Sequence, residues 1–428
     1  MEHELPWAEP SWLSSLASPY YNESHRKLQA YARKYYDEKV IPYMLEWEEK
    51  GDCPRSARDL YLKSGLALIE IPREYRPKDY CSVAGIPVEE LDIFHRLILM
   101  DESSRVEGGV MVALSGGANV IGVPPIINHG TEAQKRRWLP GLFTGETSFC
   151  LGITEPSGGS DVSNLKTTAK KSADGRHYVV SGTKKWITGS PWATHMTTAV
   201  RTGGPGAAGI SLLVIPLSLP GVSVEKIQNS GQSAGGASWV RMDNVQVPAD
   251  HLIGIENAGF RYVMKNFNNE RFVMAVGCNR KARTCLSTAL AYAFERETFG
   301  VPLISHQVIR HKIVTLARDV EAHWARLEQI AYHVNQHGWD SRDIAGPIAM
   351  AKISGGRILE LAAREAQQVM GGVAYQRKGP GGGGRVEQIT RDLRMMVVGG
   401  GSEEILGDLA FKEEIKTAKR KAKEKAKL

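Results

Sequence analysis

The hydrophobic period of the sequence changes twice along the chain, and this order limits the folds that it can adopt. Residues 22–145 place apolar side chains mainly at helical spacing, residues 148–255 form short β-rich runs between turn signals, and helical spacing returns from Ala258. One apolar stripe steps by three or four positions through Ile313, Leu316, Val320, Trp324, Leu327 and Ala331. The pattern predicts a helical domain, a β-domain and a second helical domain suited to a four-helix bundle.

Local signals set the expected elements and the domain boundaries. Tyr20–Lys50 is expected to be one long amphipathic helix, and Thr131 to cap a helix that ends at Pro140-Gly141. The stretch Gly379–Gly384 follows no strand and contains a proline, so we expect a flexible surface loop and not a phosphate-binding loop. The predicted parts are an N-terminal helical domain at 1–147, a β-domain at 148–256, a helical bundle at 257–412 and a basic tail at 413–428.

The net charge of the chain is concentrated at its C-terminal end. The 428 residues have a formal net charge of +7, and the segment Lys416 to Leu428 holds seven Lys/Arg and one Glu, which is +6 of that total. The body is therefore nearly neutral, and we expect no nucleic-acid partner. The tail is interpreted as a solvated helical extension or as an address on an extended terminus, because Ala426-Lys427-Leu428 resembles the tripeptide that peroxisomal import receptors bind. This resemblance predicts a peroxisomal location, with a cytoplasmic one as the alternative.

Composition argues against several other classes of protein. No stretch approaches the roughly 18 apolar residues of a membrane-spanning helix. The five cysteines have no paired spacing, which predicts neither a disulfide framework nor a zinc site, and no metal is expected. The first ten residues, MEHELPWAEP, are typical of neither a signal peptide nor a mitochondrial presequence.

Two short motifs could carry chemistry. Residues 150–161 read CLGITEPSGGSD, in which Gly158-Gly159 is expected to form a turn with backbone N–H groups free to face a ligand, beside the hydroxyls of Thr154 and Ser160. Residues 185–189 read KWITG, and Trp186 is interpreted either as a platform for a flat cofactor or as a core residue.

Taken together, these motifs resemble the signature segments of the acyl-CoA dehydrogenase family of FAD flavoproteins. TEPSGGSD and GTKKWITG are followed in the family's order by ERETFGVPLISHQ, QVMGGVAY and RDLRMMVVGGGSEEI, so that the resemblance covers about residues 25–412. It implies a mainly α fold with a helical N-domain, a barrel-like middle β-domain and a C-terminal four-helix bundle. The implied reaction is α,β-dehydrogenation of an acyl-CoA to a trans-2,3-enoyl-CoA.

The resemblance also implies which residues contact FAD. Within one subunit, the backbone from Leu151 to Thr154 would face the pyrimidine side of the flavin, Trp186 would cover one flavin face and Thr188 would lie near the reactive nitrogen. Arg296 would reach the FAD of a neighbouring subunit, although alone it could equally form a salt bridge with an adjacent glutamate. Such shared sites imply a homotetramer or homodimer. The implied cofactor-binding residues are Leu151, Ile153, Thr154, Ser160, Trp186, Thr188, Arg296, Phe299, Gln307, Gln368, Gly371, Gly372, Ser402 and Glu404.

The reaction needs a carboxylate base, and the resemblance implies its place. Many family members carry a glutamate at the position that is Gly400 here. Isovaleryl- and long-chain-type members instead place it before an arginine at the start of a long helix, and Glu270-Arg271 occupies that place here. Glu270 is therefore the predicted base, and its alternative role is a glutamate stabilised by a helix N-terminus. The implied substrate-binding residues are Ser160, Asn268, Arg271 and Gly400, whereas Glu403 and Glu404 are expected to be capping residues.

The electron acceptor and the wider role stay open at this point. A peroxisomal enzyme would pass electrons to O2 and behave as an oxidase, whereas other family members use an electron acceptor flavoprotein. A DNA-associated relative without dehydrogenase activity is a further alternative, which the neutral body disfavours. A nitroalkane-oxidising relative would need an acidic residue at Gly400.

Overall fold

The computed structural model describes residues 5–14 and 16–426, and its internal contacts group them into two compact units. The helical unit consists of Met1–Leu45, Asp92–Glu107 and Asn268–Leu428, and the sheet unit consists of Glu46–Leu91 and Gly108–Phe267. Each unit has its own buried apolar clusters. The boundaries predicted at residues 147, 256 and 412 stay predictions, because these units are defined by contacts and not by continuous stretches.

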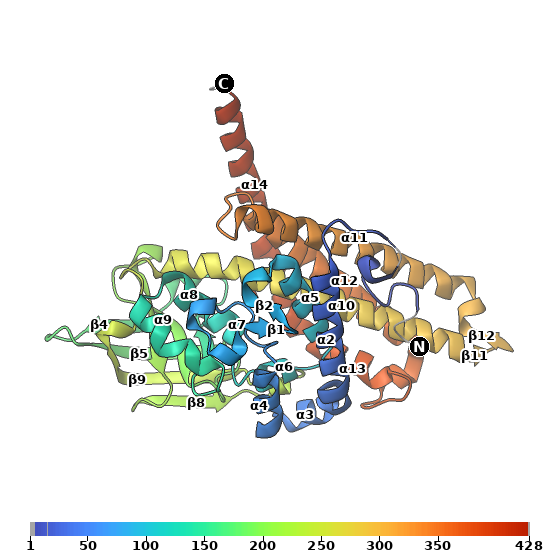
Figure 1. Ribbon diagram of the computed structural model, residues 1–428, viewed down its shortest axis with the longest axis horizontal. Coiled ribbons are helices and arrows are strands. Elements are labelled where there is room, and N and C mark those ends of the chain that lie inside the picture. Colours follow the sequence, from blue (N-terminus) through green and yellow to red (C-terminus); the bar gives the residue numbers. More distant parts are fainter. Residues whose placement is uncertain (1–4, 15, 427–428) are drawn as a thin grey trace. The chain divides into compact units, whose positions relative to one another are not determined.

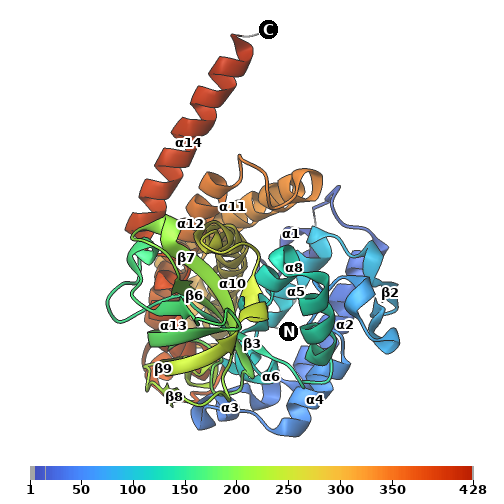
Figure 2. The ribbon, with the colours of Figure 1, turned by 90° about the vertical axis from the view of Figure 1, so that its left-hand side faces the viewer.

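The sheet unit is built on an eight-stranded sheet (Figure 2). Seven of its strands follow the order β10-β7-β6-β4-β5-β9-β8, and the eighth, β3, pairs in parallel with β6. The residues of β7 from Ile210 to Ile215 are all buried, as expected for a strand covered on both faces. Within the described residues the end strands β10 and β8 do not pair, so the sheet is open. The strands are β3 Phe149–Gly152, β4 Thr168–Lys171, β5 His177–Ile187, β6 His195–Arg201, β7 Ile210–Pro216, β8 Val222–Lys226, β9 Ser238–Pro248 and β10 Leu252–Ile253.

Short helices and a small hairpin complete the sheet unit. Thr131 caps α9 as expected, since its side chain accepts from the N–H of Gln134 while the Gln134 side chain accepts from the N–H of Thr131. These elements are α4 Arg55–Lys63, β1 Ser82–Val83, β2 Ile86–Pro87, α6 Val110–Leu114, α7 Asn119–Gly122, α8 Pro124–His129 and α9 Glu132–Trp138.

The helical unit contains the long helices expected from the sequence (Figure 1), and the six residues of the α11 stripe are all buried. The expected helix over Tyr20–Lys50 is instead two helices, because Pro42 lies in a short 3-10 turn at Ile41–Tyr43 between α2 and α3. The helices are α1 Ser11–Ser14, α2 Glu23–Lys39, α3 Met44–Lys50, α5 Ile93–Ser103, α10 Gly259–Glu295, α11 Gln307–His337, α12 Ala345–Met370, α13 Gly383–Val398 and α14 Glu403–Lys425, with the hairpin β11 Glu297–Thr298 and β12 Val301–Pro302; α3 and α10 each run from one unit into the other.

The stretch Gly379–Gly384 is not the free loop that the sequence suggests. Gly383 and Gly384 are buried and begin α13, and a Cβ on Gly383 would lie 2.5 Å from the carbonyl oxygen of Val373. The glycines are needed here because this stretch packs closely against the backbone of the 3-10 turn Gly371–Tyr375 that follows α12. The prediction of a flexible surface loop is therefore wrong for its second half.

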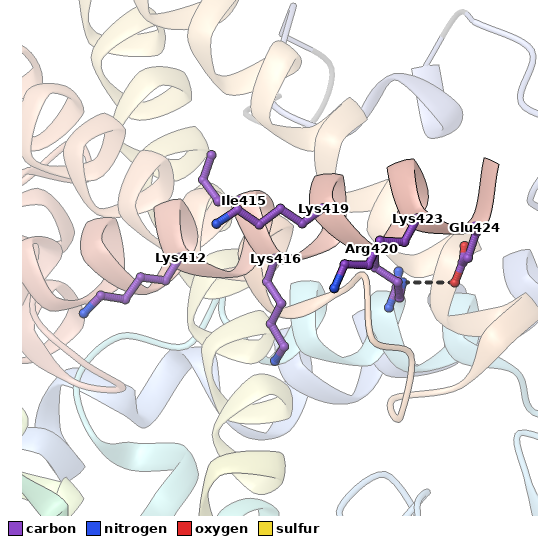
Figure 3. Close-up of a pocket in the computed structure, with 7 residues that line it drawn as sticks. All are labelled: Lys412, Ile415, Lys416, Lys419, Arg420, Lys423 and Glu424. Carbon is purple, nitrogen blue, oxygen red and sulfur yellow. Dashed lines mark ion pairs between the residues drawn. The ribbon is translucent and has the colours of Figure 1, made fainter. Parts of the chain in front are cut away.

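The basic C-terminal segment is helical as far as Lys425. Leu406 and Ala410 of α14 pack with Ala349 of α12, and Arg420 pairs with Asp343, after which α14 stands away from α12 (Figures 1 and 2). Figure 3 shows the lysines of this segment projecting from the helix, with Arg420 turned toward Glu424. The interpretation as a helical extension is therefore confirmed as far as Lys425, and Ala426 is the C-cap residue. Lys427 and Leu428, the last two residues of the proposed address, lie outside the described residues. No helix in the described part of the chain combines the length and hydropathy needed to cross a membrane.

Candidate active site

In the sheet unit, β3 leads into a tight turn that carries the first motif. The N–H of Glu155 donates to the carbonyl of Gly158 at 3.2 Å, and the N–H of Gly158 donates back to the carbonyl of Glu155 at 3.1 Å. The N–H of Gly158 is therefore already bonded, so the prediction that it is free for a ligand is wrong for this residue. Ser160 is exposed and Thr154 is partly exposed, whereas Leu151 and Ile153 are buried.

A buried ion pair holds this turn in place. Lys184 on β5 is fully buried, and its Nζ donates to the carbonyl of Ile153 at 3.0 Å and to Glu155 at 2.9 Å. The Glu155 carboxylate also accepts from the backbone N–H groups of Lys166 and Thr167. Burial lowers the pKa of Lys184 to about 8 although Glu155 raises it. One ion pair thus joins the two sequence motifs, because Glu155 lies within residues 150–161 and Lys184 directly precedes residues 185–189. The sequence alone did not reveal this contact.

Trp186 is half exposed, with 50% of its surface accessible, so the interpretation as a core residue is wrong. The pairing of β5 with β9 slips between Lys184 and Ile187, and Trp186 adopts a left-handed backbone with φ 64° in that bulge. The bulge turns the indole out of the sheet, and the Lys185 ammonium lies 4.6 Å from its ring centroid. Thr188 follows and is partly exposed.

These residues fit a flavin. A buried carboxylate and lysine pin the backbone at Ile153 and Glu155, and a half-exposed indole held by a bulge offers a flat apolar face beside it. Leu151, Ile153 and Thr154 would present the strand edge, Trp186 the stacking face, and Thr188 a hydroxyl.

In the helical unit, Glu270 has the environment of a base. Its Oε2 is buried and has no hydrogen-bond partner among the described residues. Burial raises the pKa of Glu270 to about 7, against the opposing charges of Arg271 and Lys352. Glu270 is the twelfth of the 37 residues of α10 and lies well beyond its first turn, so the alternative of a helix-N-terminal glutamate is wrong. Asn268, two residues earlier on α10, is partly exposed.

A glycine turn after α13 lies beside Arg271. Gly400 and Gly401 have positive φ values of 69° and 118°, and the Nε of Arg271 donates to the carbonyl of Gly400 at 2.9 Å. A Cβ on Gly400 would lie 3.1 Å from the Met274 sulfur and 3.5 Å from the Arg271 side chain. A side chain at this position would be strained by the positive φ and crowded against Met274 and Arg271, so the turn favours glycine.

The residues implied to reach a neighbouring subunit are exposed. Phe299 is 97% exposed with φ 54°, and Arg296, Gln307 and Gln368 are also exposed. Gly371 and Gly372 have open space at their Cβ positions. Arg296 forms no ion pair with Glu295 or Glu297 among the described residues, which removes the alternative of a local salt bridge.

The two glutamates after the glycine turn begin α14. Ser402 is its N-cap residue without a side-chain capping bond, and Glu404 is exposed in the first turn. Glu403 pairs with Arg357, which lowers the pKa of its carboxyl. Glu403 is therefore engaged at the surface, in agreement with its assignment as a non-catalytic residue.

One polar cluster was missed by the sequence analysis. The carboxylate of Asp92 lies 3.0 Å from the Nε2 of His25 and 2.8 Å from the Nδ1 of His95, and the two imidazole rings stack at 3.8 Å. These three residues could reach a metal ion. However, both imidazoles complete capping boxes at the starts of α2 and α5, which accounts for their ring contacts with the backbone. The spacings Asn22 to His25 and Asp92 to His95 were the available signal.

Comparison with known proteins gives matches along nearly the whole chain. Residues 22–146 match the acyl-CoA dehydrogenase N-terminal domain, residues 150–245 the acyl-CoA dehydrogenase middle domain and residues 257–413 the acyl-CoA dehydrogenase C-terminal domain.

Individual relatives agree with these matches. The chain is 40% identical to acyl-CoA dehydrogenase apdG of Emericella nidulans over 98% of its length and 97% of that protein. It is 42% identical to acyl-CoA dehydrogenase AFT10-1 of Alternaria alternata, over 97% of each chain. The crystal structure of an acyl-CoA dehydrogenase from Geobacillus kaustophilus superposes with a TM-score of 0.83 at 26% identity, covering 93% of this chain and 99% of that one. With this fold and these matches, the chain belongs to the acyl-CoA dehydrogenase family of FAD-dependent oxidoreductases.

Proposed function

We propose that the protein dehydrogenates an acyl-CoA thioester to a trans-2,3-enoyl-CoA, with Glu270 as the base that removes the α-proton. The observation that carries this assignment is the Glu270 carboxyl itself, whose Oε2 is buried without a partner and whose pKa is raised by burial to about 7. A base with a pKa near the working pH is both free to accept a proton and strong enough to remove one.

The bond changes balance with these groups. The α-carbon gives its proton to Glu270, the β-carbon gives up a hydride, and the electron pair of the α C–H bond forms the new double bond. FAD, when bound, supplies the acceptor for the hydride. Arg271 beside the base carries positive charge that stabilises the carboxylate before the transfer.

The test is a Glu270→Gln variant. Wild-type holoenzyme is mixed anaerobically with a panel of acyl-CoA thioesters of different chain length and branching, and loss of the flavin's visible absorbance is followed. The variant should retain FAD and lose the bleaching by at least about a hundredfold. A matched Glu360→Gln variant, which removes a partly exposed carboxylate of α12 that pairs with Arg394, should bleach normally. Normal bleaching in the Glu270 variant would overturn the assignment.

We further propose that reduced flavin passes its electrons to O2 in a peroxisome. This proposal is supported by the sequence Ala426-Lys427-Leu428, which follows α14 in the chain, and by the exposure of the last turns of that helix. An air pulse after anaerobic reduction should reoxidise the flavin and release hydrogen peroxide, and slow reoxidation that an electron acceptor flavoprotein accelerates would contradict it. A fluorescent fusion should lose its peroxisomal location when the last three residues are deleted.

A homo-oligomer, a tetramer or a dimer, is proposed on the exposure of Arg296, Phe299, Gln307 and Gln368, which would contact the FAD of a neighbouring subunit. Analytical ultracentrifugation of the holoenzyme should give a mass of two or four chains. A Phe299→Ala variant should lower FAD retention together with the oligomer population, and a monomer that binds FAD normally would contradict the proposal.

A further inference from the structure

Lys352 is a buried lysine that the proposed reaction does not use. It lies in α12 and is 2% exposed. Its Nζ donates to the carbonyl of Gly401 at 2.9 Å and to the carbonyl of Val397. Lysine is rarely buried unless its charge is paired, yet among the described residues no carboxylate lies within ion-pair distance of this ammonium. Its hydrogen-bond partners are neutral carbonyls, so no bonded carboxylate neutralises the positive charge of the Lys352 ammonium.

Close helix packing directs Lys352 to the glycine turn. A Cβ on Gly355, one turn later in α12, would lie 3.0 Å from His323 and 3.2 Å from the Cβ of Cys278 on α10. Gly356 faces Val397 at the end of α13. These two glycines allow α12 to approach α10, α11 and α13 closely. Lys352 on the same stretch of α12 reaches the carbonyl end of α13, where the helix dipole favours a cation.

The glycine turn is thus held by two cations from two helices. The Nε of Arg271 on α10 donates to the carbonyl of Gly400, and Lys352 on α12 donates to the carbonyls on either side of it, at Val397 and Gly401. Three carbonyls of five consecutive residues are therefore bonded to charged donors. Two of them, those of Gly400 and Gly401, lie beyond the end of α13 at Val398, so capping of that helix does not account for them.

The same two cations are the charged groups that act on Glu270. Burial raises the pKa of Glu270, and Arg271 and Lys352 lower it. Lys352 in turn is influenced by Cys278 and Arg271 on α10, by Glu270, and by Glu403 at the start of α14. Burial lowers the pKa of Lys352. Glu403 is held by Arg357, so its charge is largely compensated there.

We propose that Lys352 is a positioning residue for proton transfer, which holds the glycine turn in place and supplies positive charge that keeps Glu270 ready to accept a proton. The inference rests on the proposed function, because it concerns the same base. The competing role is purely structural: Lys352 would cap the end of α13 and affect only the stability of the bundle.

The experiment compares the pH dependence of anaerobic flavin bleaching in three variants of the holoenzyme. Lys352→Met removes charge and donor, Lys352→Gln retains a donor without the charge, and Lys352→Arg retains both. Loss of a nearby cation disfavours the carboxylate form of Glu270, so the Met and Gln variants should shift the rising limb of the pH–rate profile upward by about one pH unit. The rate near neutral pH should fall about fivefold and recover at higher pH, and the Arg variant should retain the wild-type profile.

The matched control is Lys281→Met. Lys281 is also buried and also donates to a backbone carbonyl, that of Val106 at 2.6 Å, while pairing with Glu107. It lies about 17 Å from Glu270 along α10. This variant should lower the thermal stability without moving the pH–rate profile.

An unchanged profile in the Gln variant would overturn the proposal, as would equal shifts in the Gln and Arg variants. If the Met variant does not fold, the comparison of Gln with Arg decides alone, and failure of both to fold would assign Lys352 to stability only. Failure of the proposed function has a different signature: wild type would not bleach with any thioester, or Glu270→Gln would bleach normally.

Discussion

Replacing Glu270 with Gln should stabilise the folded protein, and the gain should grow as the pH rises. Burial raises the pKa of the Glu270 carboxyl from 4.5 to about 7 in the folded chain. The unfolded chain therefore loses this proton at a lower pH than the folded chain does. Stability from this group is fully present below about pH 4.5 and is lost as the pH rises through about 7. Glutamine is neutral throughout and does not show this loss.

The structure sets the size of the effect. A difference of 2.5 between the two pKa values corresponds to about 3 kcal/mol of destabilisation once the carboxyl is ionised in both states. At about pH 5 the same relation gives a destabilisation of less than about 1 kcal/mol, because the folded chain still keeps Glu270 protonated. The gap in unfolding free energy between variant and wild type should therefore widen by about 2 kcal/mol from about pH 5 to about pH 8.

Urea denaturation followed by circular dichroism, at several pH values with FAD in equal excess, measures this gap. Glu360→Gln is the control, because it makes the same substitution at a partly exposed carboxylate of the helical unit that pairs with Arg394 at 3.5 Å. Parallel stability curves for wild type and the Glu270 variant would refute the reasoning, since they would mean that Glu270 titrates normally in the folded chain. Lower stability of the variant at about pH 8 would refute it as well.

Three further substitutions test the sheet unit. Lys184→Met leaves the buried Glu155 carboxylate without its ion-pair partner, so it should cost about 3 kcal/mol of stability and release FAD at lower urea, as flavin fluorescence would report; unchanged flavin retention would exclude the pair from positioning the turn. Thr131→Ala removes the α9 cap and should cost about 1 kcal/mol in urea denaturation, whereas Thr131→Ser should cost less than half of that. Gly109→Ala should prevent folding or lower the melting temperature sharply, because its Cβ would lie 1.9 Å from the backbone nitrogen of Gly235; a wild-type melting temperature would contradict the close approach.

Much of the fold could be predicted from the sequence because local periodicity and turn chemistry act over a few residues. The buried stripe of α11 and the cap at Thr131 followed from spacing alone. Where the prediction failed, a non-local contact decided the outcome. Gly383 is buried because it packs against Val373, and nothing in the local sequence records that neighbour.

The candidate site shows the same division. The sequence motifs named Trp186 and Glu270, but left each with an alternative role. The bulge between β5 and β9 turned the Trp186 indole outward, which excluded the core role, and the position of Glu270 within α10 excluded the capping role. The outcome for Trp186 depends on the pairing of β5 with β9, a strand far along the chain, and the outcome for Glu270 depends on where α10 begins.

The sequence by itself determined the order of the helical and β segments, the concentration of charge in the tail and the family to which the motifs belong. Only the tertiary structure decided which charges are buried and what they contact. Lys184 and Lys352 have the same side chain and the same intrinsic charge as the exposed lysines of α14. No local sequence pattern distinguishes the two buried lysines from the exposed ones. They differ because folding removes their ammonium groups from water and brings Glu155 or the glycine turn against them, and the free energy of a charge depends on those surroundings.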